Sequence, residues 1–175
     1  MNSNLGKNDK DASCEYQENL NILRQIDFFS GLSLEATKVF AYLCSRERFK
    51  KGEYLFQQDD EDGRAYYIIS GTAHLSQQTE GGDSIVREYG EGEFIGRLSL
   101  TGKMRRLFSL QAQSDVVCLT ISQEKFGKAL EQFPDQLPKL IRVIVENIYK
   151  LEKRFIKQRT GDCRDCMQMI GVSLV

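Results

Sequence analysis

The chain has 175 residues and a formal net charge of −1, with 24 Lys and Arg against 25 Asp and Glu. The length suits a single domain, and the absence of a basic excess argues against DNA as a partner. No apolar run approaches the roughly 18 residues that would span a membrane, and the polar N-terminus shows no secretory signal, so we expect a cytoplasmic protein whose five cysteines stay reduced.

Helical patterns occupy the first quarter of the chain. Residues 1–15 are mostly polar and are expected to form a disordered tail. Apolar positions in 16–26 are spaced for a helix, and an apolar turn follows. Ser33 is a suitable N-cap for a second helix over 34–44.

From residue 49 the pattern changes to short apolar or alternating runs separated by turn residues. Strands are predicted near 49–56, 65–69, 72–78, 85–89, 107–113 and 116–121, with hairpin turns at 71–72 and 80–83. Short strands at close spacing favour an antiparallel sandwich or barrel. Ser122 then caps a helix over 123–132, which Pro134 ends.

The last predicted helix, 137–159, carries an apolar heptad seam. Its members are Leu137, Ile141, Ile144, Ile148, Leu151 and Phe155. Such a seam predicts a homodimer that pairs through the 137–158 helix, and the alternative is a helix packed only on its own domain. Residues 160–175 lack a pattern and are predicted to be a flexible tail, too short for a winged helix-turn-helix.

The richest segment for function is 92–106, which reads Gly-Glu-Phe-Ile-Gly-Arg-Leu-Ser-Leu-Thr-Gly-Lys-Met-Arg-Arg. Its glycines frame a short apolar turn that can aim backbone N–H groups and a guanidinium at one anion. We therefore predict a ligand site made by Gly96, Arg97, Leu98, Ser99, Arg105, Arg106 and Leu107.

Together these elements resemble the cyclic nucleotide-binding domain, the effector module of catabolite activator proteins and of the regulatory subunits of cyclic-AMP-dependent kinase. Six islands match it: Phe49-x-x-Gly52-Glu53-x-Leu55-Phe56, Tyr66-Tyr67-Ile68-x-Ser70-Gly71, Gly92-x-Phe94-Ile95-Gly96, Arg106, Phe126 and Pro134. The resemblance implies an antiparallel β-roll (a double-stranded β-helix, jelly-roll-like) with flanking helices over 16–136. It also implies a regulatory role without catalysis, with cyclic AMP or cyclic GMP as the ligand and Arg106 as the phosphate-binding arginine.

The chain departs from this pattern at the ligand. The resemblance places a ribose-binding Glu directly after the second glycine, where this sequence has Arg97. Arginine has no acceptor, and losing a hydrogen bond to a charged group costs about 10- to 100-fold in affinity. Leu107 and Phe108 replace small residues after the arginine and are expected to fill the pocket.

Three interpretations follow. In the first, the segment binds no small ligand and the domain acts through an unknown partner protein. In the second, Arg97 and Arg106 bind an anion more negative than a cyclic monophosphate. In the third, cyclic AMP or cyclic GMP binds with a rearranged ribose contact. The plainest account of Arg97 itself is a surface ion pair with Glu91 or Glu93.

Other candidate residues carry weaker signals. Cys163 and Cys166 form a Cys-x-x-Cys that a dimer would bring near a second copy as a possible metal site. The acidic run 59–63 lacks the spacing of a calcium loop and is predicted to be a solvated turn. Without a nucleophile–base pair or a metal constellation, an enzyme is not expected.

Overall fold

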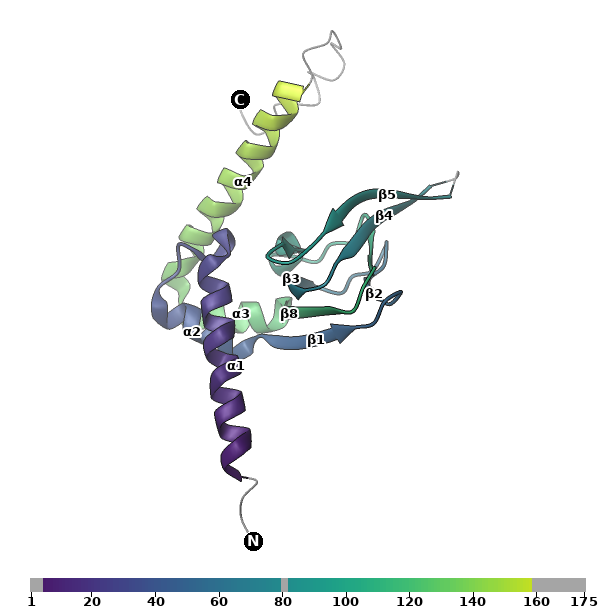
Figure 1. Ribbon diagram of the computed structural model, residues 1–175. Helices are drawn as coiled ribbons and strands as arrows, with labels where there is room; N and C mark the ends of the chain where they lie inside the picture. Colours follow the sequence, from purple (N-terminus) through teal and green to yellow (C-terminus); the bar gives the residue numbers. More distant parts are fainter. Residues whose placement is uncertain (1–4, 80–81, 159–175) are drawn as a thin grey trace.

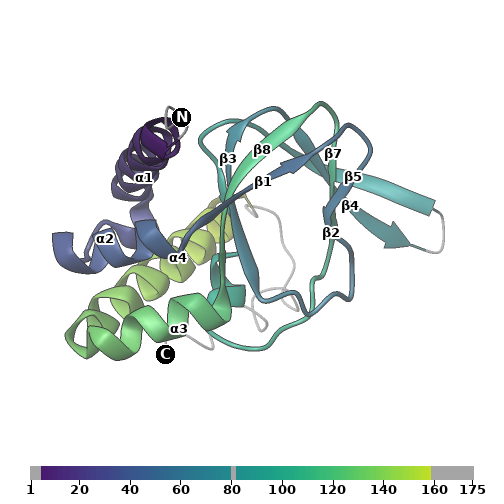
Figure 2. The ribbon, with the colours of Figure 1, turned by 90° about the horizontal axis from the view of Figure 1, so that it is seen from below.

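The computed structural model describes residues 5–79 and 82–158. Two four-stranded antiparallel sheets face each other as a β-roll, and the helices gather at one end of it (Figure 1). The predicted fold class, an antiparallel β-roll with flanking helices, is confirmed. Figure 2 shows the same division from below, with the strands on one side and the helices on the other.

One sheet has the order β1 (Ser45–Phe49), β8 (Val116–Ser122), β3 (Arg64–Ser70) and β6 (Phe94–Ile95). The other has the order β2 (Tyr54–Phe56), β7 (Ser109–Ala112), β4 (Ala73–Thr79) and β5 (Gly82–Tyr89). Between the two sheets lies an apolar core whose fully buried members include Tyr66, Ile68, Leu110, Val116 and Cys118.

The strand β7 is shorter than the predicted 107–113. It begins at Ser109 because the backbone before it is paired elsewhere. The Arg106 carbonyl accepts from Asp59 N at 2.8 Å, and Arg106 N donates to the Asp60 carbonyl at 2.9 Å. The loop that carries Arg106 is thereby tied to the loop between β2 and β3.

The helices are α1 (Leu5–Gln25), α2 (Leu34–Leu43), α3 (Gln123–Gln132) and α4 (Leu137–Gln158), with the 3-10 turns η1 (Asp27–Phe29), η2 (Arg97–Leu100) and η3 (Pro134–Gln136). Both predicted N-caps are confirmed, because Ser33 Oγ accepts from Ala36 N and Ser122 Oγ from Lys125 N. A second core joins the helices to β6 through the rings of Phe28, Phe29, Phe40, Phe94 and Phe126, whose centroids lie 5.1–6.4 Å apart.

The N-terminal segment differs from the prediction. Residues 1–15 were expected to be disordered, whereas α1 already begins at Leu5. Its C-terminal part is anchored by the buried Leu20 and Leu23. Once a helix is nucleated by packing, each further residue adds a hydrogen bond, and no proline interrupts the upstream sequence.

The helix α4 is attached through few side chains. Leu140 is buried and Ile144 packs partly against the helical core, whereas Leu137, Ile141, Val145 and Ile148 are 47%, 51%, 57% and 40% exposed. The predicted seam is therefore split, because Ile144 faces its own domain, whereas Leu137, Ile141 and Val145 form a separate exposed stripe. The side chains of Leu151 and Phe155, the predicted tail 160–175 and the Cys163–Cys166 pair lie outside the described residues.

Two cysteine thiols are shielded from solvent, Cys118 fully and Cys44 in part. Burial raises the pKa of Cys44 and of Cys118 to about 12, while Cys14 is exposed. The thiolate is the reactive form, so at about pH 8 a maleimide should label Cys14 and leave Cys44 and Cys118 unlabelled in the native protein, as peptide mapping by mass spectrometry would show. Labelling of Cys118 at the rate of Cys14 would contradict the burial.

The raised pKa values of Cys44 and Cys118 also make the free energy of unfolding fall as the pH rises above about 9, because the two thiols lose their protons at lower pH in the unfolded chain than in the folded one.

None of the described helices is long and apolar enough to cross a membrane.

Candidate functional site

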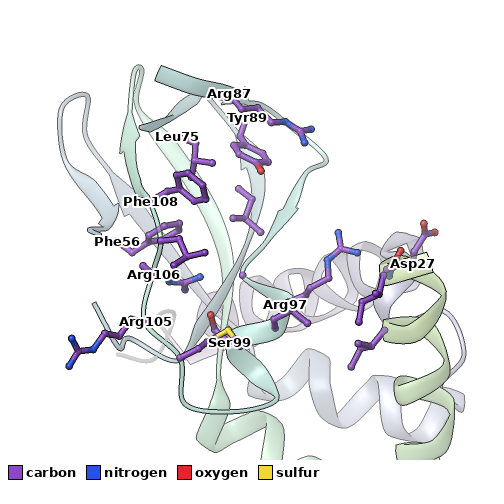
Figure 3. A pocket seen from close by; sticks show the side chains of 18 of the residues that line it. Asp27, Phe56, Leu75, Arg87, Tyr89, Arg97, Ser99, Arg105, Arg106 and Phe108 are labelled. Carbon is purple, nitrogen blue, oxygen red and sulfur yellow. The ribbon is translucent and has the colours of Figure 1, made fainter. Parts of the chain in front are cut away.

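A cavity of about 640 Å³ lies between the β-roll and α4 (Figure 3). All seven predicted ligand residues line it, namely Gly96, Arg97, Leu98, Ser99, Arg105, Arg106 and Leu107. The structure therefore brings the predicted site together in one place. What each residue can do there depends on which of its polar atoms are already occupied.

Gly96 sets the shape of the segment. Its φ of +82° lies in the left-handed region and turns the chain from β6 into η2. A Cβ at this position would lie 2.7 Å from Arg106 Nη1 and 2.7 Å from the Arg64 carbonyl oxygen. Glycine is required here because backbone and guanidinium approach it so closely.

Arg106 is already engaged inside the protein. Its Nε donates to Asp62 Oδ1 at 2.8 Å and its Nη2 to Asp62 Oδ2 at 3.0 Å, and Nη2 also donates to the Arg64 carbonyl. The guanidinium carbon lies 4.0 Å from the centre of the Phe56 ring. The side chain of Arg106 is 8% exposed and that of Asp62 is 18% exposed. This two-pronged ion pair, called the Asp62–Arg106 pair below, occupies Nε and Nη2 of the arginine without a ligand.

The prediction of a solvated acidic turn is therefore wrong for Asp62. Tyr66 encloses the carboxylate further, since its hydroxyl lies 2.9 Å from Asp62 Oδ2 and 3.0 Å from the Leu55 carbonyl oxygen. Burial first, and the charge of Asp62 second, raise the pKa of Tyr66 above its usual value. The phenol stays protonated and remains a hydrogen-bond donor in this position. Within the described chain, no group of three or more His, Cys, Asp or Glu is placed to hold a metal ion.

Arg97 stands in a different environment. It makes no ion pair with the described residues, and Glu93 is instead paired with Arg87 and accepts from Gly90 N at 2.7 Å. The predicted surface pair with Glu91 or Glu93 is therefore wrong. Figure 3 shows Arg97 reaching toward the side of the cavity where Asp27 lies, whereas Arg106 lies beside Phe56.

The remaining predicted residues lie at the rim. Arg105 is 70% exposed and pairs with Glu61 at 3.1 Å, and Figure 3 shows it pointing away from the cavity. Leu107 is 72% exposed, so it does not fill the cavity as expected, because the strand starts only after it and its side chain turns outward. Phe108 packs partly on the barrel core and lines the cavity wall.

The opposite wall was missed by sequence reasoning. It contains Asp27 of η1 and Ile144, Asn147, Ile148 and Lys150 of α4. The apolar pattern of α4 pointed to a dimer seam, and nothing in it showed that the helix also closes a cavity. The buried Nδ2 of Asn147 has no hydrogen-bond partner in the described structure.

Comparisons with known proteins agree on the fold. The sequence profile of the cyclic nucleotide-binding domain matches residues 46–133. The mouse cGMP-dependent protein kinase 2 is 25% identical over 151 residues, which are 84% of this chain and 20% of the kinase. The chain therefore spans about a fifth of the length of that relative.

Solved structures show the same likeness. A cyclic nucleotide-binding-like protein from Brucella abortus is 25% identical with a TM-score of 0.60, and the match covers 65% of this chain and 98% of that one. The N-terminal domain of a transcriptional regulator from Streptomyces coelicolor is 22% identical with a TM-score of 0.69, covering 81% of this chain and 99% of that one.

Proposed function

The chain belongs to the family of cyclic nucleotide-binding domains, and from that premise we propose that it is a regulatory module that binds cyclic AMP and cyclic GMP weakly or not at all. In this proposal its signal passes to a partner protein. The observation that carries the proposal is the Asp62–Arg106 pair, which occupies the arginine that the family resemblance assigns to the cyclic phosphate.

The competition at Arg106 is electrostatic. The Nε and Nη2 edge of the guanidinium holds Asp62, so a cyclic phosphate at Arg106 would bring its charge close to that carboxylate. Nη1 is the remaining donor group, and it faces the backbone of Gly96. A ligand that bound the Nε and Nη2 edge would have to displace Asp62 and leave this largely buried carboxylate without its partner, which is costly.

Arg97 adds a second obstacle. It takes the place of the acceptor that the resemblance assigns to the ribose hydroxyl, and a guanidinium can only donate. The two features act on neighbouring groups of a cyclic nucleotide, its cyclic phosphate and its ribose hydroxyl. Weak binding is therefore expected even where the cavity is large enough to admit one.

Calorimetry with cyclic AMP and cyclic GMP tests this proposal. The unmodified protein should show no saturable binding at ligand concentrations up to about 100 μM, whereas Arg97→Glu should tighten binding on the order of 10- to 100-fold by restoring an acceptor. The matched control is Arg105→Glu, which makes the same charge change at an exposed neighbour and should leave binding unchanged. Micromolar binding of either cyclic nucleotide to the unmodified chain would overturn the proposal.

We also propose that two copies pair through α4. Leu137, Ile141 and Val145 form an exposed apolar stripe that lies apart from the helical core, and none of the three lines the cavity. A second copy would cover it with the same residues, as in a two-stranded helical interface.

Sedimentation velocity measures this association. Ile141→Asp should convert dimers into monomers because it places a charge in the centre of the stripe. Arg142→Asp is the control. Arg142 is the next residue in the chain, but its side chain is 81% exposed and pairs with Glu146 on the outer face of the helix. Ile144 is unsuitable for this test because it packs on its own core. An Ile141→Asp protein that still sediments as a dimer would contradict the pairing.

A further inference from the structure

Unused hydrogen-bond donors line the cavity on two sides. Arg97 stands on η2, while Asn147 and Lys150 stand on α4. In the described part of the chain, the Arg97 guanidinium and the Lys150 ammonium have no ion pair or hydrogen bond. The Nδ2 atom of Asn147 is buried and has no hydrogen-bond partner there. Buried polar atoms are nearly always hydrogen-bonded, so an orphaned donor in a cavity wall points to an acceptor supplied from outside the chain.

The two α4 residues act from one face. Asn147 and Lys150 are three residues apart and are therefore neighbours on the helix surface. Both line the cavity that Arg97 lines from η2. An anion between these elements would receive hydrogen bonds from both walls, and its charge would be met by two cations.

The remaining charges at the cavity are largely neutralised. Arg87 pairs with Glu93, Arg105 with Glu61 and Arg106 with Asp62. Among the described residues that line the cavity, Asp27 is the one carboxylate. Two unpaired cations against one carboxylate leave these groups with a net positive charge, and because the cations stand on two different elements, a ligand with more than one charged group can meet both.

Apolar surface lies beside these donors. Leu98 is 43% exposed, and Met104 and Ile148 are each 40% exposed, although all three line the cavity. Side chains of this kind suit the flat ring and the sugar carbons of a nucleotide better than bare inorganic phosphate. The volume of about 640 Å³ lies within the range of small-molecule sites.

We propose that this cavity binds a nucleotide with two or three phosphates, held between Arg97 on η2 and Asn147 and Lys150 on α4, with its ring on Leu98, Met104 and Ile148. The inference rests on the proposed function, because it names the ligand class of the same site. The phosphates take a different place from the one next to Arg106, so the Asp62–Arg106 pair remains intact. A bound nucleotide would join η2 to α4 and fix the position of the helix.

Calorimetry on the full chain, without added metal ions, separates the possible sources of the anion. The probes are AMP, ADP, ATP, GTP, adenosine and inorganic tripolyphosphate. Affinity should rise by at least about tenfold from AMP to ADP or ATP (or GTP), adenosine should show no binding, and tripolyphosphate should bind at least about tenfold more weakly than ATP. Equal affinity for tripolyphosphate and the nucleotides would overturn the proposal, because it would show attraction to charge alone.

Variants identify the residues. Arg97→Glu and Lys150→Glu should each weaken ATP binding by tenfold or more, and Asn147→Ala by roughly threefold to tenfold. Asp27→Asn should strengthen it, because the one lining carboxylate loses its charge. Arg142→Glu is the matched control on α4 and should have no effect, since its side chain is paired on the outer face. Thermal melting checks that each variant is folded.

The outcomes for the two proposals differ. If no probe with two or three phosphates binds, or if Arg97→Glu leaves ATP affinity unchanged, this inference fails while the weak response to cyclic nucleotides stands. If cyclic AMP binds at micromolar concentration, the proposed function fails, whatever the result with ATP.

Discussion

Replacing Arg106 by alanine should lower the free energy of unfolding by about 3 kcal/mol. The substitution leaves the Asp62 carboxylate with little solvent and without its partner, and it removes the guanidinium that stacks on Phe56. A residue reserved for a ligand would instead be nearly neutral for stability, or even stabilising when removed. Urea denaturation followed by circular dichroism measures the difference.

Arg105→Ala is the control for this prediction. Arg105 is the next residue in the chain and has its own ion pair, but that pair is 70% and 53% exposed. Its loss should change stability by no more than about 0.5 kcal/mol. The double variant Asp62→Ala with Arg106→Ala should recover part of the loss, because no charge is then left unpaired. Equal effects for Arg105→Ala and Arg106→Ala would show that the Asp62–Arg106 pair does not stabilise the fold.

Gly96→Ala should be the second large loss, about 3 to 4 kcal/mol. A residue with a Cβ is strained at this left-handed φ, and the new methyl group would also lie 2.7 Å from Arg106 Nη1 and 2.7 Å from the Arg64 carbonyl oxygen. The carbonyl belongs to β3 and cannot move without disturbing the sheet. The expected result is a lower urea midpoint and a disturbed Asp62–Arg106 pair.

Gly92→Ala separates the two contributions. Gly92 has nearly the same φ, +85°, but its Cβ would find only the Tyr67 hydroxyl at 4.0 Å. Gly92→Ala should therefore lower the free energy of unfolding only by the cost of the left-handed backbone conformation, about 1 to 2 kcal/mol. If the two glycine variants are equally unstable, the close approach at Gly96 has no energetic consequence, and the packing described there is wrong.

Much of the fold could be predicted because its signals are local. Ser33 and Ser122 precede apolar helical repeats, and the strands β4 and β5 on either side of the predicted hairpin at 80–83 pair with each other. The predicted hairpin turn at 71–72 is wrong, because it joins β3 and β4, which lie in different sheets. The residues around η2 are contiguous in sequence, so a single segment predicted seven residues that line one cavity.

The parts that were missed depend on contacts between distant segments. Asp62 and Arg106 are 44 residues apart, and an acidic run between strands looks the same whether its carboxylates face water or a guanidinium. The seam on α4 was found by its spacing, but spacing does not reveal that Leu140 anchors the helix or that Asn147 faces a cavity. The length of α1 was underestimated for the same reason, because its extension to Leu5 depends on the packing of Leu20 and Leu23 in its C-terminal part.

The sparse attachment of α4 gives it the properties of a lever. Leu140 is the one buried side chain among those described on this helix. Figure 1 shows α4 running outward from the helical end of the molecule. From Leu140 to Gln158 the helix extends about 27 Å, so a rotation of about 10° at its anchored end displaces the far end by about 5 Å. A shift at the pivot too small to disturb the aromatic core is thereby amplified to the width of a side chain at the tip.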